Sequence, residues 1–206
     1  MLCMSFMVGF DLDMTLVDSE EGITSTMDTV LRRHGFNISR EEMYATVGIP
    51  LWTSFGQWVP AELVDELVAE YRLLYKEVGI PQTKVLPGAH ETLDTIHELG
   101  GRSMVVSAKL ESAVSIIVDF LKLPLDVVVG DLYAEKKAIA LKEHGAEIYV
   151  GDHPGDIKGA RAAGALAIAV TTGPTDRSTL AALQPDVIMD SLTEFPNWLK
   201  EYVASR

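Results

Sequence analysis

Two carboxylates stand two residues apart in the run Gly-Phe-Asp-Leu-Asp-Met-Thr at residues 9–15, directly after a stretch of apolar residues. Residues two apart on an extended chain project to the same side, so Asp11 and Asp13 share one small volume. Two like charges so close together are costly to ionise unless a cation lies with them or one carboxyl keeps its proton. A metal ion and a mobile proton together indicate phosphoryl chemistry, with one carboxylate as nucleophile and the other as acid and base.

A second acidic group follows another apolar run, in Tyr-Val-Gly-Asp-His-Pro-Gly-Asp at residues 149–156. Hard carboxylate oxygens on short side chains suit Mg²⁺, which takes one or two carboxylates and completes its shell with water and phosphate. We expect Asp152, in the middle of the loop, to bind the metal. Asp156 precedes a predicted helix, so it either binds the metal or caps that helix, and the sequence favours neither.

A hydroxyl and a lysine are candidates for holding a phosphate group. Ser107 ends a predicted strand, where its hydroxyl and nearby backbone N–H groups could bind a phosphate oxygen, or where it could cap the helix near Leu110. Lys136 and Lys137 open another predicted helix, where a lysine opposes the helix dipole. We therefore expect one of the two to have an anionic partner and the other to be solvated. Lys109 is either a further positive charge near the site or an exposed residue at a helix start.

Short β-branched runs and helical patterns alternate along most of the chain, and these elements must position the residues above. The predicted strands are Met1–Phe10, Ser103–Ser107, Asp126–Gly130, Ile148–Gly151, Leu166–Val170 and a short edge strand, Val187–Met189. The predicted helices are Ala89–Leu99, Leu110–Leu121, Glu135–His144, Asp156–Ala163 and Thr193–Val203. This alternation predicts an α/β, Rossmann-like parallel sheet covered by helices on both faces. Ligands bind beyond the carboxyl ends of such strands, where the aspartates, Ser107 and also Asp131 fall.

Residues 19–84 interrupt the alternation, because about 65 residues are too many for one crossover connection. Breaks at Gly and Pro divide the segment into four predicted helices. These are Glu20–His34, Arg40–Thr46, Leu51–Val59 and Ala61–Val78. We therefore predict a small helical cap, residues 19–84, inserted after the first strand of a catalytic core of residues 1–18 and 85–206.

The chain of 206 residues is 48% hydrophobic and carries a formal charge of −13, so it can bury a full core. Its acidity argues against nucleic acid or an anionic membrane as a partner, although locally convergent cations could still bind an anionic substrate. The single Cys3 excludes an internal disulfide and suits a reducing compartment. The apolar N-terminus lacks a basic leader and is shorter than a membrane span, so we expect a cytoplasmic protein, monomeric or homodimeric.

The order Asp-x-Asp-x-Thr, Ser107, a lysine and Gly-Asp-x-x-x-Asp resembles the haloacid dehalogenase superfamily of phosphohydrolases, over essentially the whole chain. The insertion after the first motif is similar to that of its helical-cap branch, which includes phosphoglycolate phosphatases. Dehalogenases of the superfamily lack an acid at the second position, so Asp13 favours a phosphatase. The chain departs from the pattern at Met14, where glycine is frequent, and after Lys137, where Ala138 stands in place of a common proline.

The resemblance implies roles for the acidic residues. Asp11 would attack phosphorus and become an aspartyl-phosphate, and Asp13 would protonate the leaving oxygen and then activate water. Mg²⁺ would be held by Asp11, by the backbone carbonyl of Asp13 and by Asp152, with Asp156 as a further candidate ligand.

The resemblance also implies the substrate contacts. Ser107 and Lys137 would bind the transferring phosphoryl group, and Thr15 of the first motif would lie with them. Gly48, in the elbow Thr46–Leu51 of the cap, would help to choose the substrate; an ordinary turn between helices explains that elbow equally well.

These features predict a Mg²⁺-dependent phosphatase of a small phosphorylated metabolite resembling phosphoglycolate, with a cap that excludes bulk water. A phosphomutase shares the nucleophile and the acid/base but must keep water from the aspartyl-phosphate, and inorganic pyrophosphate is another candidate substrate. A non-catalytic binding or regulatory protein on this fold is the alternative of another class. Four clustered carboxylates disfavour it, because a retired site has no reason to keep them.

Overall fold

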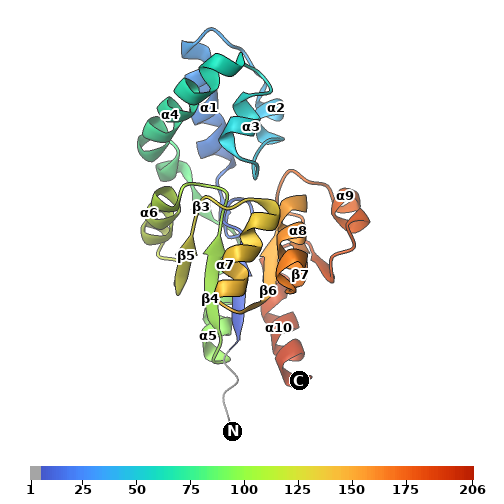
Figure 1. Ribbon diagram of the computed structural model, residues 1–206. Helices are drawn as coiled ribbons and strands as arrows, with labels where there is room; N and C mark the ends of the chain where they lie inside the picture. Colours follow the sequence, from blue (N-terminus) through green and yellow to red (C-terminus); the bar gives the residue numbers. More distant parts are fainter. Residues whose placement is uncertain (1–5) are drawn as a thin grey trace.

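A computed structural model describes residues 6–206, which form a six-stranded parallel sheet with helices on both faces (Figure 1). Its strands are β1 Met7–Phe10, β4 Arg102–Val106, β5 Val127–Val129, β6 Ala146–Gly151, β7 Leu166–Val170 and β8 Val187–Met189. Their order is β5-β4-β1-β6-β7-β8, so β1 lies inside the sheet and β8 is an edge strand as predicted. The predicted α/β fold is confirmed. Residues 1–5 of the predicted first strand, with Cys3, lie outside the described residues.

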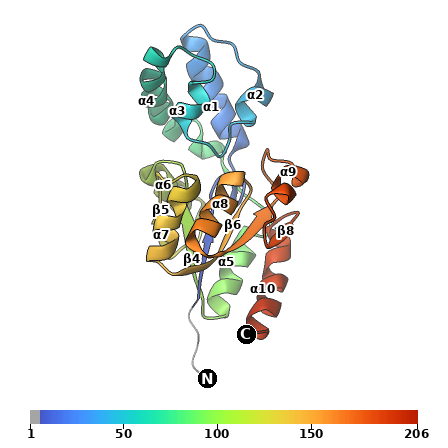
Figure 2. The ribbon, with the colours of Figure 1, turned by 45° about the vertical axis from the view of Figure 1, so that its right-hand side comes forward.

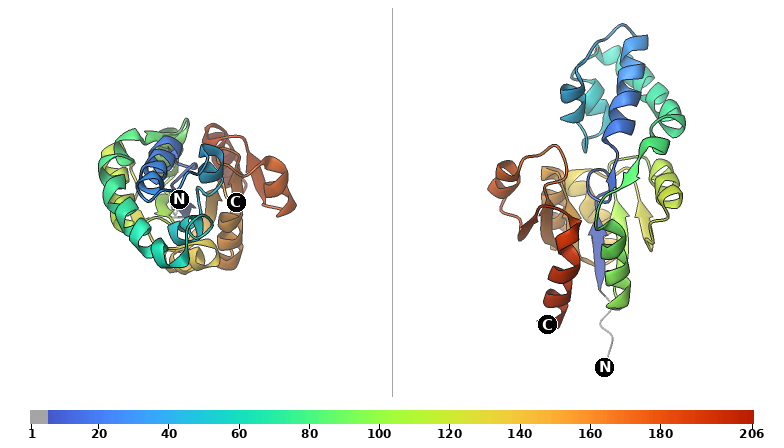
Figure 3. Two further views of the ribbon diagram at one scale, coloured as in Figure 1. Left: turned by 90° about the horizontal axis from the view of Figure 1, so that it is seen from above. Right: turned by 180° about the vertical axis from the view of Figure 1, so that it is seen from behind.

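The two faces of the sheet are covered by different helices. The helices are α1 Glu20–Arg33, α2 Arg40–Tyr44, α3 Leu51–Phe55, α4 Ala61–Glu77, α5 Ala89–Glu98, α6 Glu111–Leu121, α7 Lys137–Glu143, α8 Pro154–Ala163, α9 Arg177–Ala182 and α10 Phe195–Ala204. The helices α5 and α10 lie side by side on one face, as the rear view shows (Figure 3), and α7 and α8 pack together on the other. Helix α6 packs beside β5.

Alternate residues of each strand enter two separate hydrophobic clusters, because successive side chains of a strand point to opposite faces. Phe10 and Val150 belong to the cluster beneath α5 and α10, where the Phe10 and Phe195 rings meet edge to face at 5.7 Å. Met104 and Tyr149 belong to the cluster beneath α7 and α8. Both faces are apolar, so the strand ends and not the strand faces remain for chemistry.

Helices α1–α4 form a group above the carboxyl edge of the sheet (Figure 2). A two-stranded antiparallel ribbon, β2 Val17–Asp18 with β3 Lys84–Val85, joins this group to the sheet. The apolar residues of the group are continuous with the cluster beneath α5 and α10. A helical cap inserted after the first strand is therefore present, while its bounds of 19–84 stay a prediction.

Several predicted elements have different bounds in the structure. The helix predicted at Glu135–His144 starts as a 3₁₀ turn, Ala134–Lys136, because Ala134 has a left-handed backbone with φ of 51°. Helix α8 begins at Pro154, two residues before the predicted start, because proline lacks an N–H and is favoured in the first helical turn. Helices α2 and α3 are only 5 residues long each and end in turns. The ribbon β2–β3 and helix α9 were not predicted.

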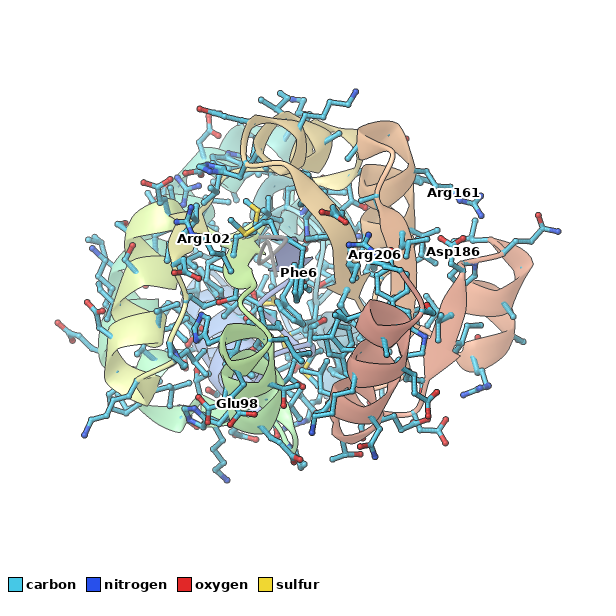
Figure 4. The ribbon with its side chains drawn as sticks, turned by 90° about the horizontal axis from the view of Figure 1, so that it is seen from below. Phe6, Glu98, Arg102, Arg161, Asp186 and Arg206 are labelled. Carbon is cyan, nitrogen blue, oxygen red and sulfur yellow. The ribbon has the colours of Figure 1, made fainter. Side chains whose placement is uncertain are left out.

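The opposite end of the sheet, seen from below, carries surface side chains around the buried Phe6 (Figure 4). Arg102 lies there with its backbone N–H on the Phe6 carbonyl oxygen (2.8 Å), and Arg206 pairs with Glu147. These are ordinary structural contacts. Among residues 6–206, no helix has the length and apolarity that crossing a membrane requires.

Candidate active site

The neighbouring strands β1 and β6 both end in an aspartate at the edge below the cap. Asp11 follows β1, and its backbone N–H donates to the Val150 carbonyl oxygen (2.8 Å), which fixes it beside β6. Asp152 follows β6, and Asp156 lies in the first turn of α8. One oxygen from each of these three carboxylates lies within 4.8 Å of the other two. We call Asp11, Asp152 and Asp156 the carboxylate cluster; all three are buried.

Lys137 places a cation inside this cluster. Its Nζ donates to Asp11 Oδ1 (2.7 Å), to Asp156 Oδ1 (2.7 Å) and to the Tyr149 hydroxyl (2.9 Å). The Tyr149 hydroxyl in turn donates to the Val106 carbonyl oxygen (2.8 Å), so its own proton is committed and its oxygen is free to accept from the lysine. All three ammonium donors of Lys137 are thus used. Lys136, by contrast, is exposed.

Burial and mutual repulsion control the protonation of the cluster. The pKa of Asp11 is raised to about 7, because burial and the neighbouring Asp156 and Asp13 together outweigh the opposing effect of Lys137. Burial, then Asp156 and Asp11, raise the pKa of Asp152 well above its ordinary value. Burial disfavours the charge of Lys137, but the carboxylates of Asp11 and Asp156 outweigh it and raise the lysine pKa. One cation for three carboxylates leaves the cluster short of positive charge.

The carboxylate of Asp152 has one satisfied oxygen and one orphaned oxygen. Oδ1 accepts from the Thr15 hydroxyl (3.0 Å), whereas Oδ2 is buried with no hydrogen-bond partner. A buried carboxylate oxygen without a donor is costly, which indicates that a cation belongs beside it. Gly173 packs so closely that a Cβ there would lie 1.8 Å from Oδ2, so only glycine leaves room for this carboxylate. Thr15, predicted to bind substrate, is fully buried and contacts Asp152 instead.

Asp156 has both of its oxygens engaged. Oδ1 accepts from Lys137, and Oδ2 accepts from the His153 backbone N–H (3.0 Å), which completes a capping box at the start of α8. His153, and not Asp156, is the residue that caps the helix. Asp156 is therefore not the N-cap that the sequence offered as one alternative. It is the third residue of the helix in the capping box, and it also holds Lys137. It remains close enough to the other carboxylates to be a candidate metal ligand.

Asp13 belongs to a separate group of contacts that reaches the cap. Its Oδ1 accepts from the Ser19 hydroxyl (2.6 Å) and lies 3.2 Å from Lys109 Nζ. Lys109 also donates to the Tyr75 hydroxyl on α4 (3.0 Å) and lies 4.2 Å from the centre of that ring. Burial disfavours the Lys109 charge, but Asp13 and Tyr75 raise the pKa above its ordinary value. The chain of contacts Asp13–Lys109–Tyr75 therefore connects the sheet edge to the cap.

Ser107 lies directly after β4, beside the aspartates. Its hydroxyl oxygen accepts from the Lys109 backbone N–H (3.2 Å), and its own N–H donates to the Val129 carbonyl oxygen (3.0 Å). It does not cap α6, whose N-cap is Leu110. Asp131, predicted at this same edge, is exposed and accepts from the Glu111 backbone N–H (3.4 Å).

A cavity of about 80 Å³ lies between the sheet edge and the cap. Asp11, Asp13 and Ser107 line its floor, while Lys137 and Thr15 are covered beneath it. The elbow Thr46–Leu51 lines the upper side of the cavity. Within it, Gly48 has a left-handed φ of 97° and packs against the His153 ring. The arrangement can hold a small ligand against two carboxylates, between the sheet edge and the cap.

The family model for haloacid dehalogenase-like hydrolases matches residues 8–170, a span that contains both acidic motifs and the cap. The chain belongs to this family. A probable phosphatase of Dickeya dadantii, IndB, is 33% identical over 91% of this chain and 90% of its own length. A phosphoglycolate phosphatase of Vibrio parahaemolyticus is 29% identical over 91% of this chain and 93% of its own.

A solved structure gives the same result for this haloacid dehalogenase-like hydrolase. A predicted phosphatase from Clostridium acetobutylicum superposes with a TM-score of 0.86 and 26% identity, covering 96% of this chain and 99% of that one. The predicted family is confirmed, and the relatives that match this hydrolase along nearly its whole length are named phosphatases.

Sequence analysis missed some residues of the site in this hydrolase. Ser19, Tyr75 and Tyr149 hold Asp13, Lys109 and Lys137 respectively. Tyr149 carried a weak signal, since a phenol inside an otherwise aliphatic buried strand needs a polar partner. Ser19 and Tyr75 carried none, because their partners are fixed by the placement of the cap.

Proposed function

We propose that this hydrolase is a Mg²⁺-dependent phosphatase of a small phosphorylated metabolite resembling phosphoglycolate, and that it works through an aspartyl-phosphate on Asp11. The main support is the position of Asp11. It is buried at the floor of the cavity, ion-paired with Lys137 and within reach of the partly unsatisfied Asp152. Relatives with similar sequences over the whole chain are named phosphoglycolate phosphatases.

A divalent cation fits this cluster. The donors are hard carboxylate oxygens, the pKa values of Asp11 and Asp152 are raised, and Asp152 Oδ2 is buried without a partner. We propose that Asp11 and Asp152, with the Asp13 backbone carbonyl, hold Mg²⁺, and that Asp156 contributes mainly by securing Lys137. When bound, the ion would neutralise the charge of the phosphate oxygens.

The residues of the chain then divide the reaction between them. An Asp11 carboxylate oxygen attacks phosphorus and forms the aspartyl-phosphate, while the bond from phosphorus to the ester oxygen breaks. Asp13 gives a proton to that leaving oxygen; its Oδ1 is engaged by Ser19 and Lys109, which leaves Oδ2 to carry the proton. Asp13 then takes a proton from water as the water oxygen attacks phosphorus and releases Asp11.

The remaining groups position the phosphoryl oxygens. Lys137 neutralises Asp11 and the transferring group, and the Ser107 hydroxyl binds one of the phosphoryl oxygens. We assign Thr15 the task of orienting Asp152, since its hydroxyl is already bonded there. Gly48 allows the cap elbow to lie over the cavity, and the small volume enclosed favours a small substrate.

Turnover of p-nitrophenyl phosphate and of a panel of phosphometabolites, with Mg²⁺ and with a chelator, tests this proposal. Release of inorganic phosphate that requires Mg²⁺ is the expected result, and an acid quench during turnover should trap base-labile phosphate on Asp11. A regulatory protein would give no metal-dependent release with any ester. Conversion of a hexose 1-phosphate to its 6-phosphate would favour a phosphomutase, and cleavage of pyrophosphate alone would favour a pyrophosphatase.

A further inference from the structure

The cavity gathers positive charge in a chain whose formal charge is −13. Among the described residues, three cationic side chains line it: Arg72, Lys76 and Lys109. Lys109 is engaged by Asp13 and Tyr75, and Lys76 is exposed. Neither Arg72 nor Lys76 takes part in an ion pair found within residues 6–206, but only Arg72 has a buried side-chain donor without a hydrogen-bond partner.

The Arg72 side chain is held in place without its donors being satisfied. Its guanidinium carbon lies 4.4 Å from the centre of the Trp52 ring, and the Trp52 indole N–H donates to Asp65 Oδ1 (2.8 Å). Helices α3 and α4 therefore support the guanidinium from one side through a fixed aromatic surface. Arg72 Nε is nevertheless buried with no hydrogen-bond partner. Because Arg72 lines the cavity, this unsatisfied donor indicates that a ligand supplies the acceptor.

We propose that Arg72 is the specificity-determining residue of this site and binds a carboxylate at the end of the substrate opposite the phosphate. The inference rests on the proposed phosphatase function and names the residue that would choose among its substrates. The planar guanidinium fork matches a carboxylate through two parallel hydrogen bonds.

Arg72 lies on α4 close to the contact that joins the cap to the floor. Tyr75 contacts Lys109, which lies 3.2 Å from Asp13 at the floor. Arg72 precedes Tyr75 by three residues, which is about 4.5 Å along a helix axis. Arg72 and Tyr75 both line the cavity that has Asp11 at its floor, so one small ligand can contact the guanidinium and the floor. Ile49 and Leu51 also line this cavity and give it an apolar wall that complements a carbon spacer.

The selectivity ratio of matched esters tests the role of Arg72. The ratio is kcat/KM for phosphoglycolate divided by kcat/KM for hydroxyethyl phosphate, which has a neutral hydroxymethyl group in place of the carboxylate. In Arg72→Gln this ratio should fall by about 10- to 100-fold, as expected for loss of a charge-assisted pair of hydrogen bonds. The matched control is Lys76→Gln, which removes the same charge from an exposed residue of the same cavity wall and should leave the ratio within about twofold.

Binding without turnover gives a second readout. In the Asp11→Asn background, phosphoglycolate should quench or shift the fluorescence of Trp52, and Arg72→Gln should weaken that binding by a similar factor. The chain has 3 tryptophans, so loss of the fluorescence change in Trp52→Phe would show that the signal comes from Trp52. A purely structural Arg72 would leave the preference for the carboxylate ligand over the neutral one unchanged.

The outcomes separate this inference from the function on which it rests. An equal loss for both esters, or no loss, in Arg72→Gln would overturn the specificity role while leaving the phosphatase intact. Faster turnover of ethanediol bisphosphate than of phosphoglycolate would overturn the carboxylate assignment. If no ester is hydrolysed by the unmodified enzyme, the proposed function fails, and the binding measurement alone then decides whether Arg72 recognises a carboxylate.

Discussion

The floor and the upper wall of the cavity differ in their polarity and in the kind of partner that their polar groups lack. At and beneath the floor, Asp11 and Asp156 are buried and each lies 2.7 Å from Lys137 Nζ, with Asp152 Oδ2 the one orphaned oxygen of the carboxylate cluster. The upper wall, from the cap, is mostly apolar and carries a guanidinium with an unsatisfied donor. The group missing at the floor is a cation, whereas the group missing at the wall is a hydrogen-bond acceptor.

This difference indicates that reactivity and substrate choice reside in separate parts of the molecule. Substitutions at the floor should change the rate for every substrate, and they should also change stability, because each removes a partner from a buried charge. Substitutions on the wall should change the ranking of substrates and have smaller effects.

The largest effect is expected for Asp11→Asn. The amide is a poor nucleophile, so the aspartyl-phosphate should not form and turnover of every ester should fall to background. The amide is nearly isosteric with the carboxylate, so the fold itself should be kept, and circular dichroism of the metal-free protein serves as the control for folding. Full turnover in this variant would refute the assignment of the nucleophile.

The two neighbouring lysines should differ sharply. Lys137→Ala removes a preorganised cation and should lower kcat by about 10²–10³. It also leaves two buried carboxylates without their partner, which should destabilise the fold by about 3–5 kcal/mol. Lys136→Ala, at the exposed adjacent position, should match the unmodified enzyme in both measurements. Equal, mild effects from the two variants would instead point to Lys109 as the catalytic cation.

Stabilisation by Mg²⁺ should depend on pH. Without metal, the pKa of Asp11 is raised from 3.8 to about 7, so the native state binds more protons than the unfolded state between those values. That contribution to stability is present below about pH 4 and is lost as pH rises through about 7. The ion takes the place of the proton, so the gap in melting temperature between Mg²⁺-loaded and metal-free protein should widen from pH 5 to pH 8.

The size of that gap also tests the ligands. At about 100 times its dissociation constant a ligand adds roughly 2.7 kcal/mol of stability. In Asp152→Ala most of the gap should vanish, and Gly173→Ala should reduce it by displacing the Asp152 carboxylate. A gap unchanged in Asp152→Ala would remove the Asp152 carboxylate from the metal site, and a gap that is the same at every pH would remove the Asp11 carboxylate from it.

The smallest effect is expected where the cap meets the floor. Tyr75→Phe keeps the ring over Lys109 but deletes the hydroxyl that accepts from its ammonium group. Loss of one such bond should lower kcat/KM by about 2- to 10-fold for all esters alike. The matched control is Tyr71→Phe, one turn away, whose ring is stacked on Tyr75 at 5.3 Å. This variant removes a hydroxyl that does not contact Lys109, so its kcat/KM should stay close to that of the unmodified enzyme. A change in substrate ranking would show that Tyr75 belongs with the selective wall.

The sequence predicted the sheet and the positions of its acidic ends, because these depend on local patterns. Asp11 and Asp152 follow buried strands directly, and Asp13 stands two residues after Asp11, so strand prediction alone brings them to one edge. The ribbon β2–β3 escaped prediction, because strands of 2 residues are too short to show alternation. Helix α9 escaped because its 6 residues follow a Gly/Pro-rich stretch typical of a loop.

Contacts between distant segments could not be predicted. Thr15 was expected at the substrate, yet its partner Asp152 stands 137 positions further along the chain. The start of α8 was placed too late, because Pro-Gly in the run His-Pro-Gly-Asp indicated a turn, whereas Pro154 is the first helical residue. The pairing of Arg72 with Trp52 likewise depends on how α3 packs against α4.

The ribbon β2–β3 has a consequence for how this enzyme can diversify. Val17 pairs with Val85 and Asp18 with Lys84, so the inserted segment leaves and re-enters the sheet domain at adjacent points. The length of chain between those points can therefore change without altering the distance that its ends must span, and the entropy of closing the loop grows only slowly with length. Recombination can thus replace one cap with another in a single insertion event, provided that the new segment supplies an apolar base. A lineage built this way inherits its reaction unchanged and acquires new substrates through the exchanged segment.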